Sequence, residues 1–241
     1  MRFEERELKP YAEPISSNEL HEGSIYFTVN HIPGDMTIPI METLVFIGRN
    51  LEPSDAGRVY FQDVRSYFDG VRYDDDVSDR DVDCAERLNV LSGSDNELGA
   101  FFDYDRALEQ LMKCSLRRRK LDEGIQMRWE GRELNPNAEP VSPTEIEEGQ
   151  LYFNVAYADD DKLVAVMQTL VFIGRDLGAG DEGKWYFQDV EAYQEGITYS
   201  PDLEDEWSEF HAASEKELVH IFEFERAPEE LMRCSLRRRK A

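Results

Sequence analysis

The sequence lacks the motifs on which most enzyme active sites are built. It contains no HExxH helix, no nucleophile elbow, no Walker loop and no GxGxxG turn. Histidine is scarce, with four residues in 241. A standard hydrolase, kinase or dehydrogenase is therefore disfavoured, and we predict no catalytic residue, no cofactor and no metal.

Long apolar runs are missing as well. No stretch approaches the roughly 20 apolar residues that a membrane-spanning helix needs. The amino terminus, Met1–Arg6, is charged and has no apolar core, so it does not resemble a secretory signal. We therefore expect a cytoplasmic protein that does not enter a membrane.

Cysteines are few and unsuitably spaced for a disulfide framework or a thiolate metal site. The three cysteines are Cys84, Cys114 and Cys234, and no CxxC pair exists. Disulfides are disfavoured in a reducing cytosol. Cys114 and Cys234 each end an apolar helical stripe, so we interpret them as small buried hydrophobic residues.

Basic residues are outnumbered by acidic ones. The 27 Lys and Arg face 52 Asp and Glu, which gives a net charge of -25. Residues 1–120 carry 24 acids and 15 bases (-9), and the remainder carries 28 acids and 12 bases (-16). Such a surface repels phosphate, so nucleic acid is disfavoured as a partner. The acidity serves either solubility in a salty cytoplasm or contact with a basic partner protein.

What the sequence does contain is a duplication. The heptapeptide Thr43–Arg49 returns letter for letter as Thr169–Arg175. We therefore predict a first α+β repeat over residues 1–120, a short linker over 121–126 and a second α+β repeat over 127–241. These two segments are called the first copy and the second copy below.

The shared heptapeptide predicts a strand in the centre of each sheet. Leu44 and Phe46 point to one face, and Val45 and Ile47 point to the other. All four side chains are apolar, so both faces of the strand should be covered.

The surrounding pattern predicts an antiparallel meander with a carboxy-terminal helix in each copy. We expect strands at 24–29, 37–49 and 59–64, with counterparts at 150–155, 163–175 and 185–190, joined by short loops. Pro39 within the long strand indicates an edge or a bulge. A hairpin should follow at 87–104 and at 208–224. Amphipathic helices should span 105–118 and 225–238.

The two copies need cover for the second face of each central strand. One helix covers one face of each sheet, so we predict that the sheets pack on each other through a pseudo-twofold operation, as in an isologous dimer. The alternative is two separate units whose open face is covered by residues 1–25 or by a partner.

Polar residues that both copies share form a candidate cluster. They are Arg49, Gln62, Asp63 and Tyr67, with counterparts Arg175, Gln188, Asp189 and Tyr193. One interpretation is structural, an Asp–Arg pair that ties adjacent strands together. The other is a small cleft in which the aspartate is a base and the arginine clamps an anion. The histidines at 21, 31, 211 and 220 have no histidine at the matching position of the other copy, which weakens a histidine site.

A basic cluster ends each predicted helix. The residues are Arg117, Arg118, Arg119 and Lys120 in the first copy, and Arg237, Arg238, Arg239 and Lys240 in the second. These cations complement the negative end of the helix dipole. As functional residues they would contact the acidic surface of another molecule, giving self-association, or less readily nucleic acid.

Together these features favour a non-catalytic acidic module for protein interaction. It would dock a basic partner as inhibitors and immunity proteins of basic toxins do, an analogy of charge alone. The alternatives are a small-ligand binder or enzyme that uses the shared polar cluster, and a self-assembling structural protein. The chain would be a monomer with pseudo-dimeric repeats or a weak homo-oligomer.

Overall fold

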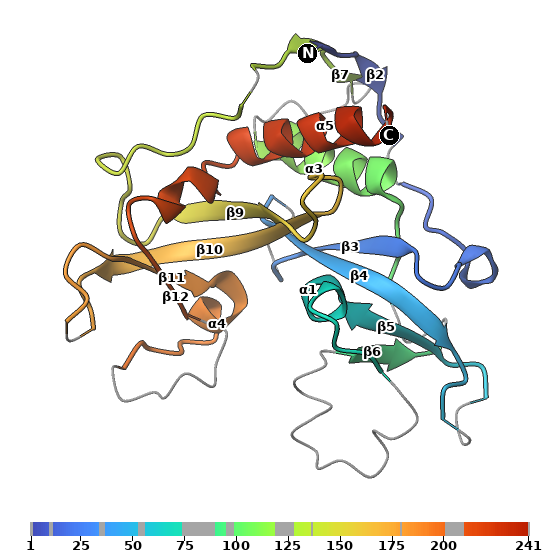
Figure 1. Cartoon of the computed structure of the whole chain (residues 1–241). Helices are drawn as coiled ribbons and strands as arrows, with labels where there is room; N and C mark the ends of the chain where they lie inside the picture. The colour runs from blue at the N-terminus through green and yellow to red at the C-terminus, as the bar shows by residue number, and fades with distance from the viewer. Residues whose placement is uncertain are drawn as a thin grey trace.

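Two antiparallel sheets and a pair of helices make up most of the computed structural model (Figure 1). The structure describes residues 2–9, 12–33, 37–52, 56–73, 90–94, 99–118, 128–135, 137–178, 180–200 and 210–240, with residues 3, 128 and 129 as backbone only. Cys84, Arg119, Lys120, the predicted linker 121–126 and residues 87–89 and 95–98 lie outside the described residues. The hairpin predicted at 87–104 is wrong, because residues 90–93 pair with residues 59–62 and Phe102 bridges to Phe27.

The first sheet is a meander of four strands in the order β3-β4-β5-β6. They are β3 (Ile25–His31), β4 (Pro39–Arg49), β5 (Val59–Asp63) and β6 (Val90–Gly93). Pro39 is the first residue of β4, a position where the missing backbone donor is tolerated. The meander prediction is confirmed. The edge or bulge predicted at Pro39 is explained by its position at the beginning of β4.

The second sheet has five strands in the order β12-β11-β10-β9-β13. They are β9 (Leu151–Tyr157), β10 (Ala165–Arg175), β11 (Trp185–Asp189), β12 (Phe210–Ala213) and β13 (Ile221–Phe222). The hairpin predicted over 208–224 is wrong, because β12 pairs with β11 and β13 pairs with β9 at the opposite edge. The 3-10 turn η3 (Glu217–His220) precedes β13, and Phe222 then joins the core beneath the helices.

The strands β4 and β10 are central in their sheets, as the heptapeptide predicted. On one face, Leu44 and Phe46 pack with Phe61 and Phe101, and Ile15 and Leu20 close this cluster. On the other face, Val45 packs with Val164 and Val166 of the other sheet. Both faces are therefore covered, one by the sheet's own flanking segments and the other by the partner sheet.

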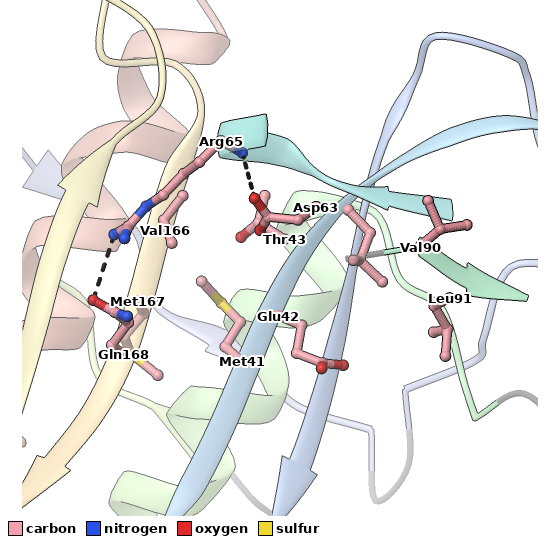
Figure 2. Close-up of a pocket in the computed structure, with 11 residues that line it drawn as sticks. Met41, Glu42, Thr43, Asp63, Arg65, Val90, Leu91, Val166, Met167 and Gln168 are labelled. Carbon is pink, nitrogen blue, oxygen red and sulfur yellow. Dashed lines mark hydrogen bonds between the residues drawn. The ribbon is translucent and has the colours of Figure 1, made fainter. Parts of the chain in front are cut away.

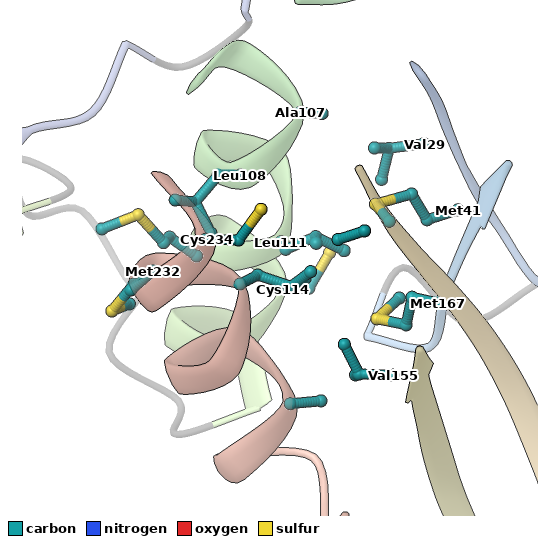
Figure 3. Packing of buried hydrophobic residues seen from close by; sticks show 14 of the residues in the cluster. Val29, Met41, Ala107, Leu108, Leu111, Cys114, Val155, Met167, Met232 and Cys234 are labelled. Carbon is teal, nitrogen blue, oxygen red and sulfur yellow. The ribbon is translucent and has the colours of Figure 1, made fainter. Parts of the chain in front are cut away.

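The helices α3 (Tyr104–Arg118) and α5 (Arg226–Arg238) lie side by side over β3 and β9 (Figures 1 and 3). Their apolar faces share one core with both sheets, in which Leu108, Leu111 and Met232 are buried against Met41 and Met167. The predicted helices are thus confirmed. Because both contribute to a single core, neither sheet has a helix-covered core of its own.

Short extended segments cross the outer side of this helix pair. The strands β1 (Arg2–Phe3) and β2 (Arg6–Glu7) pair with β8 (Arg132–Glu133) and β7 (Arg128–Trp129). Two ion pairs connect the segments to the helices, Arg6 to Glu109 at 3.4 Å and Arg132 to Glu229 at 2.8 Å. This pairing was not predicted from the sequence.

Candidate functional site

A groove of about 480 Å³ lies where β4 and β10 approach each other (Figure 2). Its walls come from both sheets and from Arg65, the second residue of the short helix α1 (Val64–Phe68). The lining residues are Met41, Glu42, Thr43, Leu44, Asp63, Arg65, Val90, Leu91, Val166, Met167 and Gln168.

The polar side chains of this groove already have hydrogen-bond partners, some of them outside the groove. The Arg65 guanidinium is 3.5 Å from Gln168 Oε1, which also accepts a 3.1 Å hydrogen bond from Asn154. Glu42 accepts a 2.7 Å hydrogen bond from the hydroxyl of Thr28. The groove therefore offers one cation, Arg65, and two carboxylates, Glu42 and Asp63, to a small molecule, and none of its lining residues is a nucleophile paired to a base.

Asp63 caps a helix and does not pair with Arg49. Its Oδ1 accepts the backbone N–H groups of Arg65 and Ser66 at 2.9 and 3.0 Å. Leu44 is the register partner of Asp63, whereas Arg49 lies opposite Val59 at the far end of the β4–β5 ladder. The predicted Asp–Arg pair is wrong, because the strand register separates the two side chains along the ladder.

Asp189 repeats this arrangement in the second sheet. It caps α4 (Val190–Gln194) by accepting the backbone N–H groups of Glu191 and Ala192. A carboxylate with two backbone donors satisfies the orphan N–H groups of a helix start. The strand predicted at 59–64 and at 185–190 therefore ends at the aspartate, where a helix begins.

The other shared residues are also distributed rather than gathered. Arg49 lies over the ring of Phe46 and donates to the carbonyl of Ser17, and Arg175 lies 4.2 Å over the ring of Trp185. Gln62 and Gln188 are buried and donate to the carbonyls of Val71 and Ile197 at 3.0 and 2.9 Å. These amides attach the chain that follows each short helix to its strand.

Tyr67 and Tyr193 differ in their surroundings. The Arg72 guanidinium lies 3.8 Å from the centre of the Tyr67 ring. Tyr193 is 44% exposed. The eight shared residues are therefore not gathered in one cleft, although Gln188 and Tyr193 line the same groove.

The basic clusters that end the helices contact this chain's own groups. Arg237 donates to Tyr157 Oη at 2.6 Å and to the carbonyl of Lys162 at 3.0 Å. Arg238 donates to the carbonyl of Leu163 at 2.7 Å and lies over the ring of Tyr104. Two further contacts complete the set, Arg239 with Asp105 at 3.3 Å and Arg118 over Phe224 at 4.5 Å. Arg117 has contacts of its own, and Lys240 is exposed.

A second groove, of about 600 Å³, is lined by glutamates and aromatic residues. It lies between residues 144–152 and 223–225, where Arg118 from α3 reaches the second sheet. The glutamates are Glu145, Glu147, Glu223 and Glu225, and the aromatic residues that line the groove are Tyr152 and Phe224. Burial raises the pKa of Tyr152, and the negative charges of Glu147 and Glu223 act in the same direction.

The buried cysteines are poorly suited to chemistry. Cys114 Sγ lies 3.0 Å from His31 Nε2, a distance at which a histidine could activate a thiol. Burial, however, raises the pKa of the Cys114 thiol to about 12, so it stays protonated and unreactive near neutral pH. Cys234 is buried as well, and burial raises its pKa. The interpretation of both cysteines as buried residues is confirmed.

The described residues lack two kinds of feature. They contain no group of three or more His, Cys, Asp or Glu side chains arranged to hold a metal ion. Within the same residues, no helix has the length and apolar character needed to cross a membrane. Comparison with protein-family models, curated proteins and solved structures found no match for this chain.

Proposed function

We propose that this chain is a non-catalytic, acidic module that binds a basic protein, in the manner of an inhibitor or immunity protein. The observation that carries the proposal is that the basic and acidic side chains are placed differently. The net charge is -25, and the arginines whose contacts are described lie against this chain's own carbonyls, carboxylates and rings. Many glutamates and aspartates face solvent instead.

Buried Arg233 is an extreme case of this inward placement of cations. It is 1% exposed, donates to the carbonyl of Asn135 at 2.7 Å and pairs with Glu230 at 3.3 Å. Arg226 and Arg132 both reach Glu229, at 3.3 and 2.8 Å. Arginines that contact this chain's own groups do not offset the negative charge of its outer surface. That surface can therefore attract a basic partner electrostatically.

The groove lined by four glutamates is an acidic surface suited to such contact. The carboxylates of this groove can receive Lys or Arg side chains through charge-assisted hydrogen bonds, whereas the ring of Phe224 is already covered by Arg118 of this chain. Glu145, Glu147 and Glu223 have no ion-pair partner among the described residues, whereas Glu225 accepts a 2.9 Å hydrogen bond from Ser115. Binding would thus recruit carboxylates that the fold leaves unpaired.

We also propose that the two copies are related by a pseudo-twofold operation. Reciprocal contacts support this arrangement. Ser115 donates to Glu225 and Ser235 donates to Asp105, at 2.9 and 2.8 Å. Likewise, Arg118 lies over the ring of Phe224 and Arg238 over that of Tyr104. The chain would then be a monomer that imitates a dimer, and we place it in the cytosol on sequence grounds alone.

A small-ligand binder is the second candidate function. It is favoured by the groove of about 480 Å³ between β4 and β10, in which the Arg65 guanidinium makes a long hydrogen bond of 3.5 Å to Gln168. Self-assembly through the basic clusters receives less support, because Arg237, Arg238 and Arg239 are occupied within the chain.

Affinity capture from the native cell extract at two salt concentrations tests the main proposal. Captured proteins should be basic and should be released at about 1 M salt, where charges separated by more than ~3 Å are screened. The triple variant Glu145→Gln, Glu147→Gln, Glu223→Gln should capture less, and Asp160→Asn, Asp161→Asn, Glu182→Gln is a charge-matched control away from the groove. Capture that resists salt, or that the control variant loses equally, contradicts a groove-centred interaction.

A further inference from the structure

The short helices α1 and α4 are followed by segments with the same backbone hydrogen bonds but different side chains. Asp69 N–H and Glu195 N–H close the two helices by donating to the carbonyls of Arg65 and Glu191, at 2.9 and 3.0 Å. Val71 and Ile197 then donate to Ser66 and Ala192, at 3.1 Å in both cases. By sequence position, Thr198 corresponds to Arg72 in the first copy.

Arg72 shows how an arginine is held at this place. Its guanidinium lies 3.8 Å from the centre of the Tyr67 ring. The same group donates to the carbonyl of Val71 at 3.0 Å and to the carbonyl of Tyr67. The carbonyl of Val71 also accepts Gln62 Nε2 at 3.0 Å, so it uses both of its lone pairs.

The second copy presents the same partners without the arginine. The exposed ring of Tyr193 lines a groove of about 370 Å³ together with Ile197 and Thr198. The carbonyl of Ile197 accepts Gln188 Nε2 at 2.9 Å, which leaves one lone pair for another donor. The groove also contains the carboxylate of Glu148, which has no hydrogen-bond or ion-pair partner among the described residues.

We infer that the groove beside Tyr193 binds an arginine side chain of the basic partner, held as Arg72 is held in the first copy. The guanidinium stacks on Tyr193 and donates to the backbone carbonyls of Tyr193 and Ile197. The negative charge of the Glu148 carboxylate attracts it. A flat, multiply donating guanidinium fits such a site better than a lysine ammonium, which is a compact and strongly hydrated charge. The inference rests on the proposed function, since it specifies one contact of the same basic partner.

Two short capped peptides, Gly-Arg-Gly and Gly-Lys-Gly, test this site directly by backbone amide NMR titration of the full chain. The arginine peptide should shift the amides of Tyr193 and of residues 197–199, and it should bind more tightly than the lysine peptide. Equal binding of both peptides at these residues, or shifts centred on another surface, overturns the inference.

Variants that move arginine between the copies sharpen the test. Thr198→Arg supplies the guanidinium from the chain itself and should weaken peptide binding about tenfold or more. Gln194→Arg adds the same charge on α4 outside the groove and should leave binding within about twofold. Arg72→Thr should open the first copy and create a second site that shifts Tyr67. Retained binding in Thr198→Arg, or no gain in Arg72→Thr, contradicts the parallel between the copies.

The outcome can be separated from that of the proposed function. If basic proteins are captured equally by the wild type and by Thr198→Arg, the proposed function stands and this site is not the one used. If the arginine peptide binds at Tyr193 but no basic protein is captured, the site stands and the proposed function fails.

Discussion

The hydroxyl of Thr43 donates a 2.9 Å hydrogen bond to the backbone carbonyl of Ala165, across the contact between the two sheets. Thr169, the matching residue in the second copy, donates to the carbonyl of Pro39 at 2.6 Å. Both hydroxyls are buried and both acceptors begin a central strand. This pair of contacts fixes where β4 and β10 meet, and so positions the groove that they form.

Removal of either hydroxyl should destabilise the fold without opening a cavity. Thr43→Val keeps the shape but leaves the Ala165 carbonyl buried and unpaired, at a cost of about 1–3 kcal/mol. Thr169→Val should cost a similar amount, and Thr43→Ser, which retains the donor, should cost less. Urea denaturation measures these differences. An unchanged midpoint in Thr43→Val would show that the crossing contact contributes nothing to stability.

Asp63 should matter to stability as a helix cap and not as a catalytic base. Asp63→Ala should destabilise the chain by about 1 kcal/mol, whereas Asp63→Asn, which keeps a capping oxygen, should lose only a few tenths. Asp189→Ala should behave as Asp63→Ala does. Thermal denaturation is the measurement, and Asp69→Ala on the same helix is the control. If Asp63→Asn is as damaging as Asp63→Ala, the charge of the side chain and not its capping bonds is what counts.

Substitution of the arginines that end α5 should lower the stability of the fold and leave the oligomeric state unchanged. Arg238→Ala removes a hydrogen bond to Leu163 and the contact with the Tyr104 ring, so a loss of roughly 1 kcal/mol is expected. Lys240→Ala, at an exposed position next to the cluster, should be within about 0.5 kcal/mol of the wild type. Denaturation and sedimentation velocity should be measured together. A change of oligomeric state with unchanged stability in Arg238→Ala would revive self-assembly through this cluster.

Alkaline pH should weaken the fold in part through Cys114. Burial raises the pKa of this thiol from 9.0 to about 12, so the folded state favours the protonated form. The resulting stability is fully present below pH 9 and is lost as the pH rises toward 12. The slope attributable to one such group is at most about 1.4 kcal/mol per pH unit. Cys114→Ala should lower overall stability but flatten this alkaline slope, and identical slopes in both proteins would assign the effect to other groups.

Much of the framework was predictable because it depends on local periodicity. The apolar heptapeptide identified the central strands, since Leu44 and Val45 must both be covered. The amphipathic pattern of residues 105–118 identified the helix. These signals involve neighbouring residues, so they survive whatever tertiary arrangement follows.

The pairing of distant segments was less accessible to sequence reasoning. Strands β12 and β13 read as a hairpin, but Phe222 is buried by pairing with β9, and only the tertiary structure provides that edge. Asp63 read as an unusual charge within a strand, although an aspartate followed by a short apolar turn is also a helix start. The basic clusters read as solvated or intermolecular, because their acceptors, such as the carbonyl of Leu163, lie 75 residues away in the chain.

The central claim is that acidic groups of this chain bind a basic protein, and the salt dependence of that binding tests it most directly. A captured partner, once identified, can be titrated with the wild type and with the Glu145→Gln, Glu147→Gln, Glu223→Gln variant at increasing salt. The account predicts that the wild-type affinity falls steeply with salt, because surface charges are screened within about 10 Å at 0.1 M salt. The variant should bind more weakly and show a shallower dependence. Affinities that do not change with salt, with equal values for both proteins, would contradict it.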